Sequence, residues 1–165
     1  MCIRDRQNTI AHILKHTPHT SNLYFHRRDE IPNEKRKKGY IVITGDKGLA
    51  GAYNHNVLKL TEQEIVKGGE IKLFIIGQVG RMYFARKGIL YEAYFQYTAQ
   101  NPSMYRAREI SELILSKFLS EELDDVYVVY TDMISSMKEE AKLLQILPFR
   151  RERFENLHSG KPVSY

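Results

Sequence analysis

The stretch that most constrains this chain is residues 39–56, GYIVITGDKGLAGAYNHN. Residues 40–44 are nearly all β-branched or aromatic, which favours a buried strand. Glycines interrupt the strand at Gly45 and Gly48, and the residues from Leu49 onward suit the first turns of a helix. A strand, a glycine turn and a helix in this order form the first unit of an open α/β sheet.

The glycine turn has two competing interpretations, a phosphate-binding turn and a structural turn. A dinucleotide fingerprint needs G-x-G-x-x-G, whereas Gly45, Gly48 and Gly51 follow one another at intervals of three. Asp46 stands where the backbone would approach a phosphate and would repel it, and Gly48-Leu49 lacks the Gly-Lys-Ser/Thr ending of a P-loop. We therefore favour a structural turn in which Asp46 caps helix amides.

Further strands and helices alternate along the rest of the chain. We expect strands at 71–76, 89–94, 126–131 and 141–147, the last at a sheet edge. Helices are expected up to Val66, over 81–87, and after Asn101-Pro102-Ser103, where Asn101 or Ser103 would be the cap. We expect residues 133–138 to form a turn or short crossover. The predicted core-facing stripe of the last helix is Met104, Ala107, Ile110, Ile114 and Phe118.

This order predicts an α/β fold, a Rossmann-like, doubly wound, mainly parallel five-stranded sheet, with the remnant of an N-terminal helix at 7–16. The expected organisation is a helix remnant and basic linker over 1–39, the globular domain over 40–149, and a polar tail over 150–165. The 165 residues are enough for one domain, and no apolar run approaches the ~20 residues of a membrane span. The net charge of +5 is too small to indicate nucleic acid by itself.

The sequence offers no convincing catalytic or metal site. His12 and His16, with His19 nearby, lack further ligands for zinc, so we expect solvent-facing histidines. No G-x-S-x-G elbow is present. Asp46 and Asp132 follow neighbouring strands and could form an acid–base pair, but a turn-capping and a loop aspartate are the simpler interpretation. We expect no catalytic residue, no metal and no cofactor.

Residues 43–56 closely resemble the S-D-[RK]-G-L-C-G-[GA]-[FYL]-N-x-N segment of the gamma subunit of F-type ATP synthases. Blocks at 75–77, 101–103, 125–137 and 147–148 resemble later segments of that family in the same order. Mild departures are Gly45 for serine, Ala50 for cysteine and Met133 for phenylalanine. On this resemblance, the structural turn of the family motif comprises Gly45, Asp46, Lys47, Gly48, Leu49, Gly51, Asn54 and Asn56.

The resemblance implies a non-catalytic central-stalk, or rotor, subunit that couples proton translocation through the membrane ring to ATP synthesis on the alpha and beta subunits. It implies the epsilon subunit, the membrane c-ring and the alpha and beta subunits as partners, with no nucleic acid and no direct membrane insertion. The implied location is peripheral, on the cytoplasmic side of the membrane. The family has a long helix at each terminus, so we expect this chain to be a fragment without the coiled-coil shaft.

Basic residues beside the globular part are the candidate subunit interface. The run EKRKK at 34–38 either contacts an acidic partner or is a solvated linker, and four adjacent charges are not expected to enter the sheet. The candidate interface residues are Lys35, Arg36, Lys37, Lys38, Arg150 and Arg151.

Two other functions compete with the stalk subunit. The glycine turn motivates a small Rossmann-type nucleotide-binding or oxidoreductase domain. A receiver-like regulatory domain would need an acidic pair at the first strand end and an aspartate after the third strand, and residues 94–100 contain no aspartate.

Overall fold

The computed structural model describes residues 30–47, 52–96 and 103–149. Nearly all of them lie in one compact unit, Arg28–Ile146. The predicted helix at 7–16, the histidines at 12, 16 and 19, and the candidate interface residues Arg150 and Arg151 lie outside the described residues.

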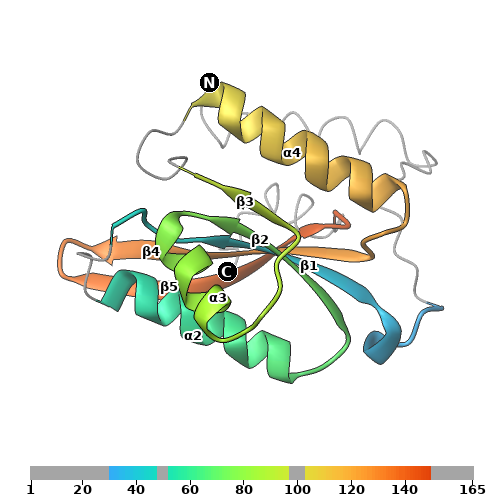
Figure 1. Cartoon of the computed structure of the whole chain (residues 1–165), viewed down its shortest axis with the longest axis horizontal. Helices are drawn as coiled ribbons and strands as arrows, with labels where there is room; N and C mark the ends of the chain where they lie inside the picture. The colour runs from blue at the N-terminus through green and yellow to red at the C-terminus, as the bar shows by residue number, and fades with distance from the viewer. Residues whose placement is uncertain (1–29, 48–51, 97–102, 150–165) are drawn as a thin grey trace, which may run out of the picture. The chain divides into compact units, whose positions relative to one another are not determined.

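Strands and helices alternate through the described chain (Figure 1). The elements are the 3-10 turn η2 (Asn33–Lys35), β1 (Lys37–Ile43), α2 (Ala52–Val66), β2 (Glu70–Ile76), α3 (Gln78–Arg86), β3 (Ala93–Phe95), α4 (Met104–Leu119), β4 (Asp125–Ser135) and β5 (Lys138–Leu147).

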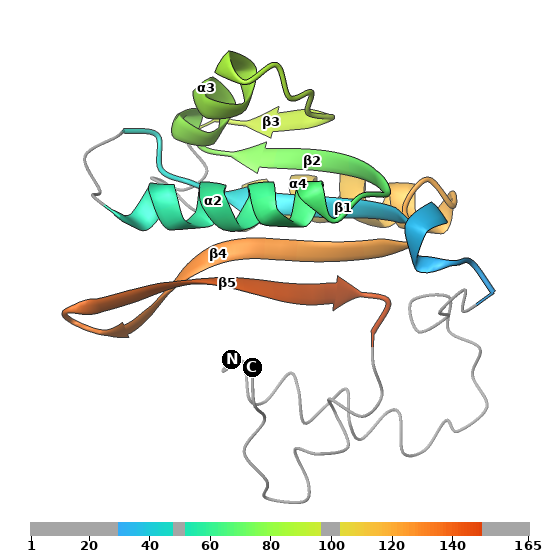
Figure 2. The ribbon, with the colours of Figure 1, turned by 90° about the horizontal axis from the view of Figure 1, so that it is seen from below.

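The five strands form one sheet in the order β3-β2-β1-β4-β5. β1 pairs in parallel with β2 and with β4, and β2 pairs in parallel with β3. β5 runs back along β4, so these two strands form a hairpin at one edge (Figure 2). The predicted α/β, Rossmann-like, mainly parallel five-stranded sheet is confirmed, including an edge position for the last strand.

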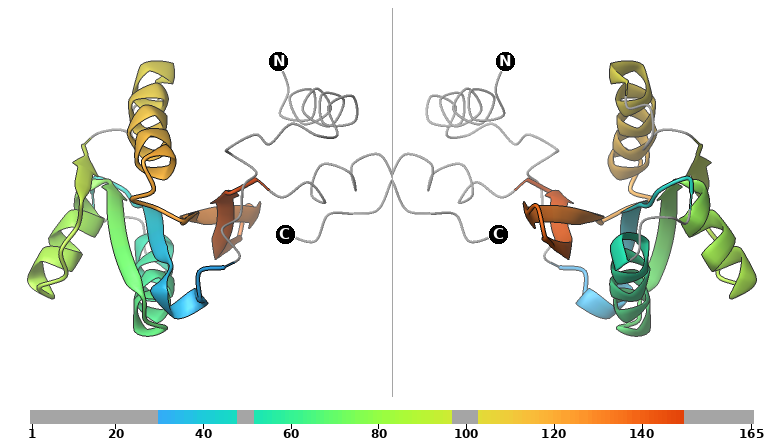
Figure 3. Two further views of the ribbon diagram at one scale, coloured as in Figure 1. Left: turned by 90° about the vertical axis from the view of Figure 1, so that its right-hand side faces the viewer. Right: turned by 90° about the vertical axis from the view of Figure 1, so that its left-hand side faces the viewer.

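Helices cover both faces of the sheet. α2 and α3 lie on one face and α4 on the other (Figure 3). The chain reverses its direction across the sheet between β1 and β4, because α2 and α3 lead outward to β2 and β3 while α4 leads back past β1. This is the doubly wound arrangement, and its switch point lies between the carboxyl ends of β1 and β4.

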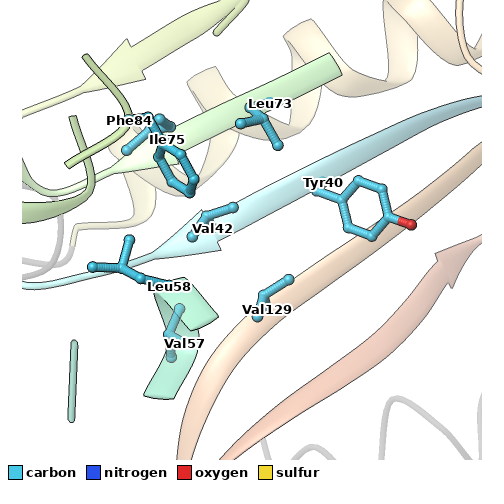
Figure 4. Close-up of a cluster of buried hydrophobic side chains, with 8 residues drawn as sticks. All are labelled: Tyr40, Val42, Val57, Leu58, Leu73, Ile75, Phe84 and Val129. Atoms are coloured by element: carbon cyan, nitrogen blue, oxygen red, sulfur yellow. The ribbon is translucent and has the colours of Figure 1, made fainter. Parts of the chain in front are cut away.

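The core lies on both sides of the three central strands. On the α2 and α3 side, alternate strand residues meet side chains of those two helices, as β-strand geometry requires (Figure 4). The buried cluster there comprises Tyr40, Val42, Leu73, Ile75 and Val129 of the strands with Val57, Leu58 and Phe84 of the helices. Ile41 and Phe74 are also buried and alternate to the opposite face. Burial on both faces explains why these strands read as continuous apolar runs.

The third strand is shorter and later than predicted. The aromatic and β-branched residues at 89–94 suggested a strand, but only Ala93–Phe95 pairs with β2. Gly88 has a left-handed φ of 68°, and the Ile89 amide still donates to the Phe84 carbonyl at 2.9 Å. The chain is therefore still leaving α3 where the strand was expected.

The region predicted as a turn or crossover at 133–138 is a hairpin instead. β4 continues to Ser135 and β5 begins at Lys138. The residues there are largely charged and polar and lack the apolar pattern of a strand, because neither strand is fully buried in this part.

Helix α4 begins after Ser103, whose side chain accepts a hydrogen bond from the Arg106 amide, so Ser103 is the cap. Ile110, Ile114 and Phe118 are buried as predicted. Met104 and Ala107 are exposed, contrary to the predicted stripe. Their spacing is helical, but the first turns of α4 lie beyond the buried part of the helix.

Candidate functional site

The two turns that follow β1 and β2 are bonded directly to each other. The Thr44 hydroxyl donates to the Ile76 carbonyl at 2.8 Å and accepts from the Gly80 amide at 3.0 Å. The Gly45 carbonyl accepts from the Val79 amide at 3.1 Å. Two consecutive residues of the first turn, Thr44 and Gly45, thus face the second turn.

Asp46 completes this contact at the start of α3. Its Oδ1 atom accepts from the Gln78 amide at 3.1 Å. Amides at the start of a helix are an anion-binding position, and here an internal carboxylate occupies it. The sequence assigned Asp46 to the amides of the helix that directly follows β1, whereas the described contact is with α3, 32 residues further along the chain.

Asn54 ties the first turn to α2. The buried side chain of Asn54 accepts from the Gly45 amide through Oδ1 at 2.8 Å. Among the other predicted turn residues, Lys47 is exposed and Asn56 is half-buried. Gly48, Leu49 and Gly51 lie outside the described residues.

The glycines of the second turn are required by close packing. Gly77 has a φ of 93°, and a Cβ atom there would lie 2.1 Å from the Thr44 carbonyl oxygen. A Cβ atom on Gly80 would lie 2.9 Å from the Thr44 hydroxyl and from a methyl group of Ile75. The first turn therefore packs directly against the backbone of the second turn.

The two candidate aspartates have different partners. Asp46 faces α3, whereas Asp132 pairs with Lys142 of β5 at 2.7 Å. Among residues 30–47, 52–96 and 103–149, no group of three or more His, Cys, Asp or Glu side chains could hold a metal ion. Nor does any helix in these ranges have the length and apolar character needed to cross a membrane.

The basic run does not lie wholly in solvent, which corrects the prediction that it forms a solvated linker or exposed patch. Arg36 is only 4% exposed. Its Nε and Nη2 atoms donate to the two carboxylate oxygens of Asp125 at 2.6 and 2.8 Å. These hydrogen bonds with Asp125 raise the pKa of Arg36. A buried arginine can be accommodated because this bidentate pairing satisfies it.

Lys37 and Lys38 lie in β1 and are half-buried, contrary to the expectation that these charges stay outside the sheet. Long lysine stems can pack on apolar surface while the ammonium group reaches polar atoms. The Lys37 ammonium donates to the Glu121 carbonyl at 3.2 Å. Lys35 is exposed.

Sequence reasoning missed the acidic partners of this run. The Asp124 amide donates to the Lys37 carbonyl at 2.7 Å, and the Asp124 carboxylate accepts from the Lys37 amide at 2.8 Å. Asp125 lies 89 residues from Arg36. The available signal was a pair of aspartates directly before a predicted buried strand, a place where unpaired charges are disfavoured.

The comparison with known proteins identifies the family. The sequence model of a family described as ATP synthase matches residues 2–165. The ATP synthase gamma chain of Ruminiclostridium cellulolyticum is 47% identical over 143 residues, covering 86% of this chain and 48% of that relative. The chain belongs to the ATP synthase gamma-chain family.

Other gamma chains show the same partial coverage. The sodium-ion-specific ATP synthase gamma chain of Acetobacterium woodii is 33% identical over 153 residues, which are 93% of this chain and 48% of that relative. The chain thus spans about half the length of the curated gamma chains it matches.

Solved structures of rotors have the same fold. A chain in the central stalk and c-ring structure of the Tetrahymena thermophila mitochondrial ATP synthase superposes with a TM-score of 0.60 at 17% identity, covering 99% of this chain and 80% of that chain. A rotor chain of the Euglena gracilis mitochondrial enzyme gives 0.52 at 12% identity, covering 93% and 60%.

Proposed function

We propose that this chain is the globular part of a central-stalk, or rotor, subunit of an F-type ATP synthase. In this role it has no catalytic centre of its own and couples ion translocation through the membrane ring to ATP synthesis on the alpha and beta subunits. The observation that carries the proposal is the match of the ATP synthase family across residues 2–165, together with gamma-chain relatives of up to 47% identity.

The geometry of the turns supports a role without nucleotide. In a doubly wound sheet, a nucleotide would bind at the carboxyl ends of the strands. Here the Gly45 carbonyl, the Thr44 hydroxyl and the Asp46 carboxylate take the first three amides of α3. The observation that motivated a nucleotide-binding or oxidoreductase domain is therefore better explained by packing between two turns.

The proposed partners are the epsilon subunit, the c-ring and the alpha and beta subunits, and the proposed location is peripheral, on the cytoplasmic side of the membrane. The Tetrahymena chain that shares this fold belongs to a central stalk and c-ring assembly, which supports a position of this kind. Lys35 is the described basic residue best exposed for a partner in the 35–38 run.

Calorimetry with the purified 165-residue chain tests the proposal. The chain is titrated separately with the epsilon subunit of the same organism, with ATP and with NAD. We expect heat of binding with epsilon and none with either nucleotide at millimolar concentration. Micromolar nucleotide affinity without epsilon binding would overturn the proposal in favour of a Rossmann-type nucleotide-binding domain.

An Asp46→Ala variant gives a matched control for the nucleotide titrations. It removes the internal carboxylate from the α3 amides without changing the glycines. Weak nucleotide binding that appears only in this variant would support the closed-turn explanation. Measurable nucleotide binding of equal affinity by both proteins would contradict it.

A further inference from the structure

The hairpin formed by β4 and β5 projects beyond the end of the neighbouring strand β1 (Figure 2). The pairing of β1 with β4 ends at Val42 and Val129, and β1 itself ends at Ile43. β4 continues for six more residues, 130–135, before the turn. At about 3.3 Å per residue, this part of the strand reaches ~20 Å past the last β1 partner.

The end of this projection is apolar. We define the hairpin tip as residues 133–137, with the sequence MISSM. Within it Met133 is 57%, Ile134 48% and Met137 96% exposed. Single exposed apolar residues are common on protein surfaces, but three within five residues at a projecting point form a cluster. Hairpin turns normally carry polar residues or glycine, so the turn itself does not explain this composition.

Charges around the tip indicate what kind of surface it meets. Residues 132–142 contain three acidic side chains (Asp132, Glu139 and Glu140) and two basic ones (Lys138 and Lys142), a net charge of −1 in a chain of net charge +5. Asp132 and Lys142 pair at the base, which leaves the exposed Lys138, Glu139 and Glu140 as a flank with a net charge of −1. An anionic lipid surface attracts basic flanks, so this flank favours a protein partner with basic residues.

We propose that the hairpin tip is a docking finger that inserts into an apolar pocket with a basic rim on another protein of the ATP synthase. Met133, Ile134 and Met137 fill the pocket, and Glu139 and Glu140 face its rim. Methionine suits this use because its unbranched, polarisable side chain adapts to irregular pockets. The inference rests on the proposed function, which supplies the assembly in which the partner is found.

The chain contains its own probes for this contact. Peroxide oxidises an exposed methionine when the thioether sulfur attacks one peroxide oxygen, which forms the sulfoxide and releases water. The free chain should be oxidised fastest at Met137. Met104 on α4 and Met82 on α3 are also exposed and serve as internal references away from the tip.

The first experiment compares oxidation of the free 165-residue chain with oxidation after assembly with purified alpha, beta and epsilon subunits and c-ring. We expect at least tenfold slower oxidation at Met133 and Met137 in the assembly, with a smaller change at Met82 and Met104. An unchanged rate at Met137 in an assembled complex would overturn the inference and leave the proposed function intact. Failure of the wild-type chain to assemble would contradict both.

The second experiment uses variants. Met133→Ser, Ile134→Ser and Met137→Ser are combined, and Leu90→Ser is the matched control because Leu90 is 90% exposed in the loop between α3 and β3. We expect equal thermal stability for both variants. The tip variant should bind the assembly of alpha, beta and epsilon subunits and c-ring at least tenfold more weakly than the wild-type chain, and the control should bind it equally well. Equal affinity of the tip variant and wild type would refute the finger.

Charge reversal identifies the rim. Glu139→Lys with Glu140→Lys should weaken assembly severalfold at low salt and less at high salt, because complementary charges are screened by ions. Vesicles of phosphatidylglycerol and phosphatidylcholine are tested in parallel with the wild-type chain and the triple serine variant. Tip-dependent vesicle binding, strengthened by the charge reversal, would assign the tip to a membrane surface and contradict the protein pocket.

Discussion

Strand β4 belongs to two regions that use the same residue types in different ways. Near its start, Asp125 is buried and accepts two hydrogen bonds from Arg36, with a third from the side-chain Nε2 atom of Gln145 at 3.3 Å. Seven residues later, Asp132 pairs with Lys142 while both side chains remain partly exposed. The first pair lies in the body of the sheet, and the second lies in the projecting hairpin.

Polar contacts therefore determine this fold in the body of the sheet more than in the hairpin. In the body, buried polar atoms and close backbone contacts leave little freedom to change a residue. In the hairpin, water can replace a lost partner, so changes affect surface chemistry more than folding. The five predictions below test this contrast, starting from the largest effect.

Gly77→Ala should damage the body most. Its Cβ atom would lie 2.1 Å from the Thr44 carbonyl oxygen, and the residue would keep a φ of 93°. We expect a loss of more than about 4 kcal/mol in the free energy of unfolding, measured by urea denaturation. Gly68→Ala is the control, since Gly68 has a φ of 84° with nothing within 4 Å of the added atom, and should lose only ~1–2 kcal/mol. Equal losses would show that the contact with Thr44 is unimportant.

Asp125→Asn should have the next largest effect on stability. It removes the charge that pairs with the buried Arg36 guanidinium through two hydrogen bonds, at an expected loss of about 3 kcal/mol in the free energy of unfolding. The double variant Arg36→Met with Asp125→Leu removes both charges and should be more stable than Asp125→Asn. If the double variant is the less stable of the two, the ion pair itself, and not the isolated charge, determines stability at this position.

Asn54→Ala should have an intermediate effect. The Gly45 amide would lose its acceptor at the turn between β1 and α2, at a cost of about 1–3 kcal/mol. Asn56→Ala is a suitable control because Asn56 is half-buried two residues away on the same helix. Thermal unfolding of both variants measures the difference, and indistinguishable Tm values would contradict a specific role for the Asn54 side chain.

Lys117→Met should produce a small, pH-dependent loss in the free energy of unfolding. The hydrogen bond from Lys117 lowers the pKa of Glu92 below its usual 4.5, so the pair stabilises the fold above that pH and the contribution disappears as the pH falls through the lowered pKa. The bond with Glu92 raises the pKa of Lys117 above 10.5, so the contribution is present below that pH and is lost as the pH rises further.

The loss in Lys117→Met should therefore be no more than about 1 kcal/mol between pH 6 and 9 and should shrink in acid. Tm measured from pH 3 to pH 8 gives the profile. Arg106→Met on the same helix is the control, because Arg106 meets Glu109 at 3.7 Å with both side chains exposed. A loss that stays constant down to pH 3 would assign the effect to packing of the lysine stem.

Asp132→Ala should have the smallest effect on folding. Its partner Lys142 keeps access to water, although the pairing with Asp132 raises the pKa of Lys142. We expect no measurable change in Tm, in contrast to Asp125→Asn on the same strand. A Tm drop comparable with that of Asp125→Asn would remove the distinction between the sheet body and the hairpin.

Local pattern was sufficient to predict much of the sheet body. The run at 40–44 and the apolar run at 71–76 locate two central strands because burial on both faces leaves a clear signal. The glycine spacing and Asp46 also argued against a phosphate cradle, which stays a prediction from the sequence. The close packing of Gly77 and Gly80 against Thr44 could be seen only in the fold, because Thr44 is more than thirty residues away in the sequence.

Long-range partners account for most of what the sequence did not reveal. A run of four charges predicts solvent-exposed side chains. Arg36 is buried only because Asp125 lies beside it in the fold, and no local sequence pattern indicates that contact. The hairpin was missed because its exposed residues alternate weakly and its turn contains no glycine. Met133 and Met137 are exposed because β4 extends past the end of β1. Only the register of the two strands shows the length of this extension.

The carboxylate of Asp46 has a further consequence for the evolution of this fold. Because it is tethered and oriented at the start of α3, it competes for the Gln78 amide without the entropy cost that a free anion would meet. A descendant of this sequence could therefore acquire an anion site at this helix only by first losing Asp46. The Gly45 carbonyl and the Thr44 hydroxyl would still hold the next two amides, so this loss alone would free only the Gln78 amide.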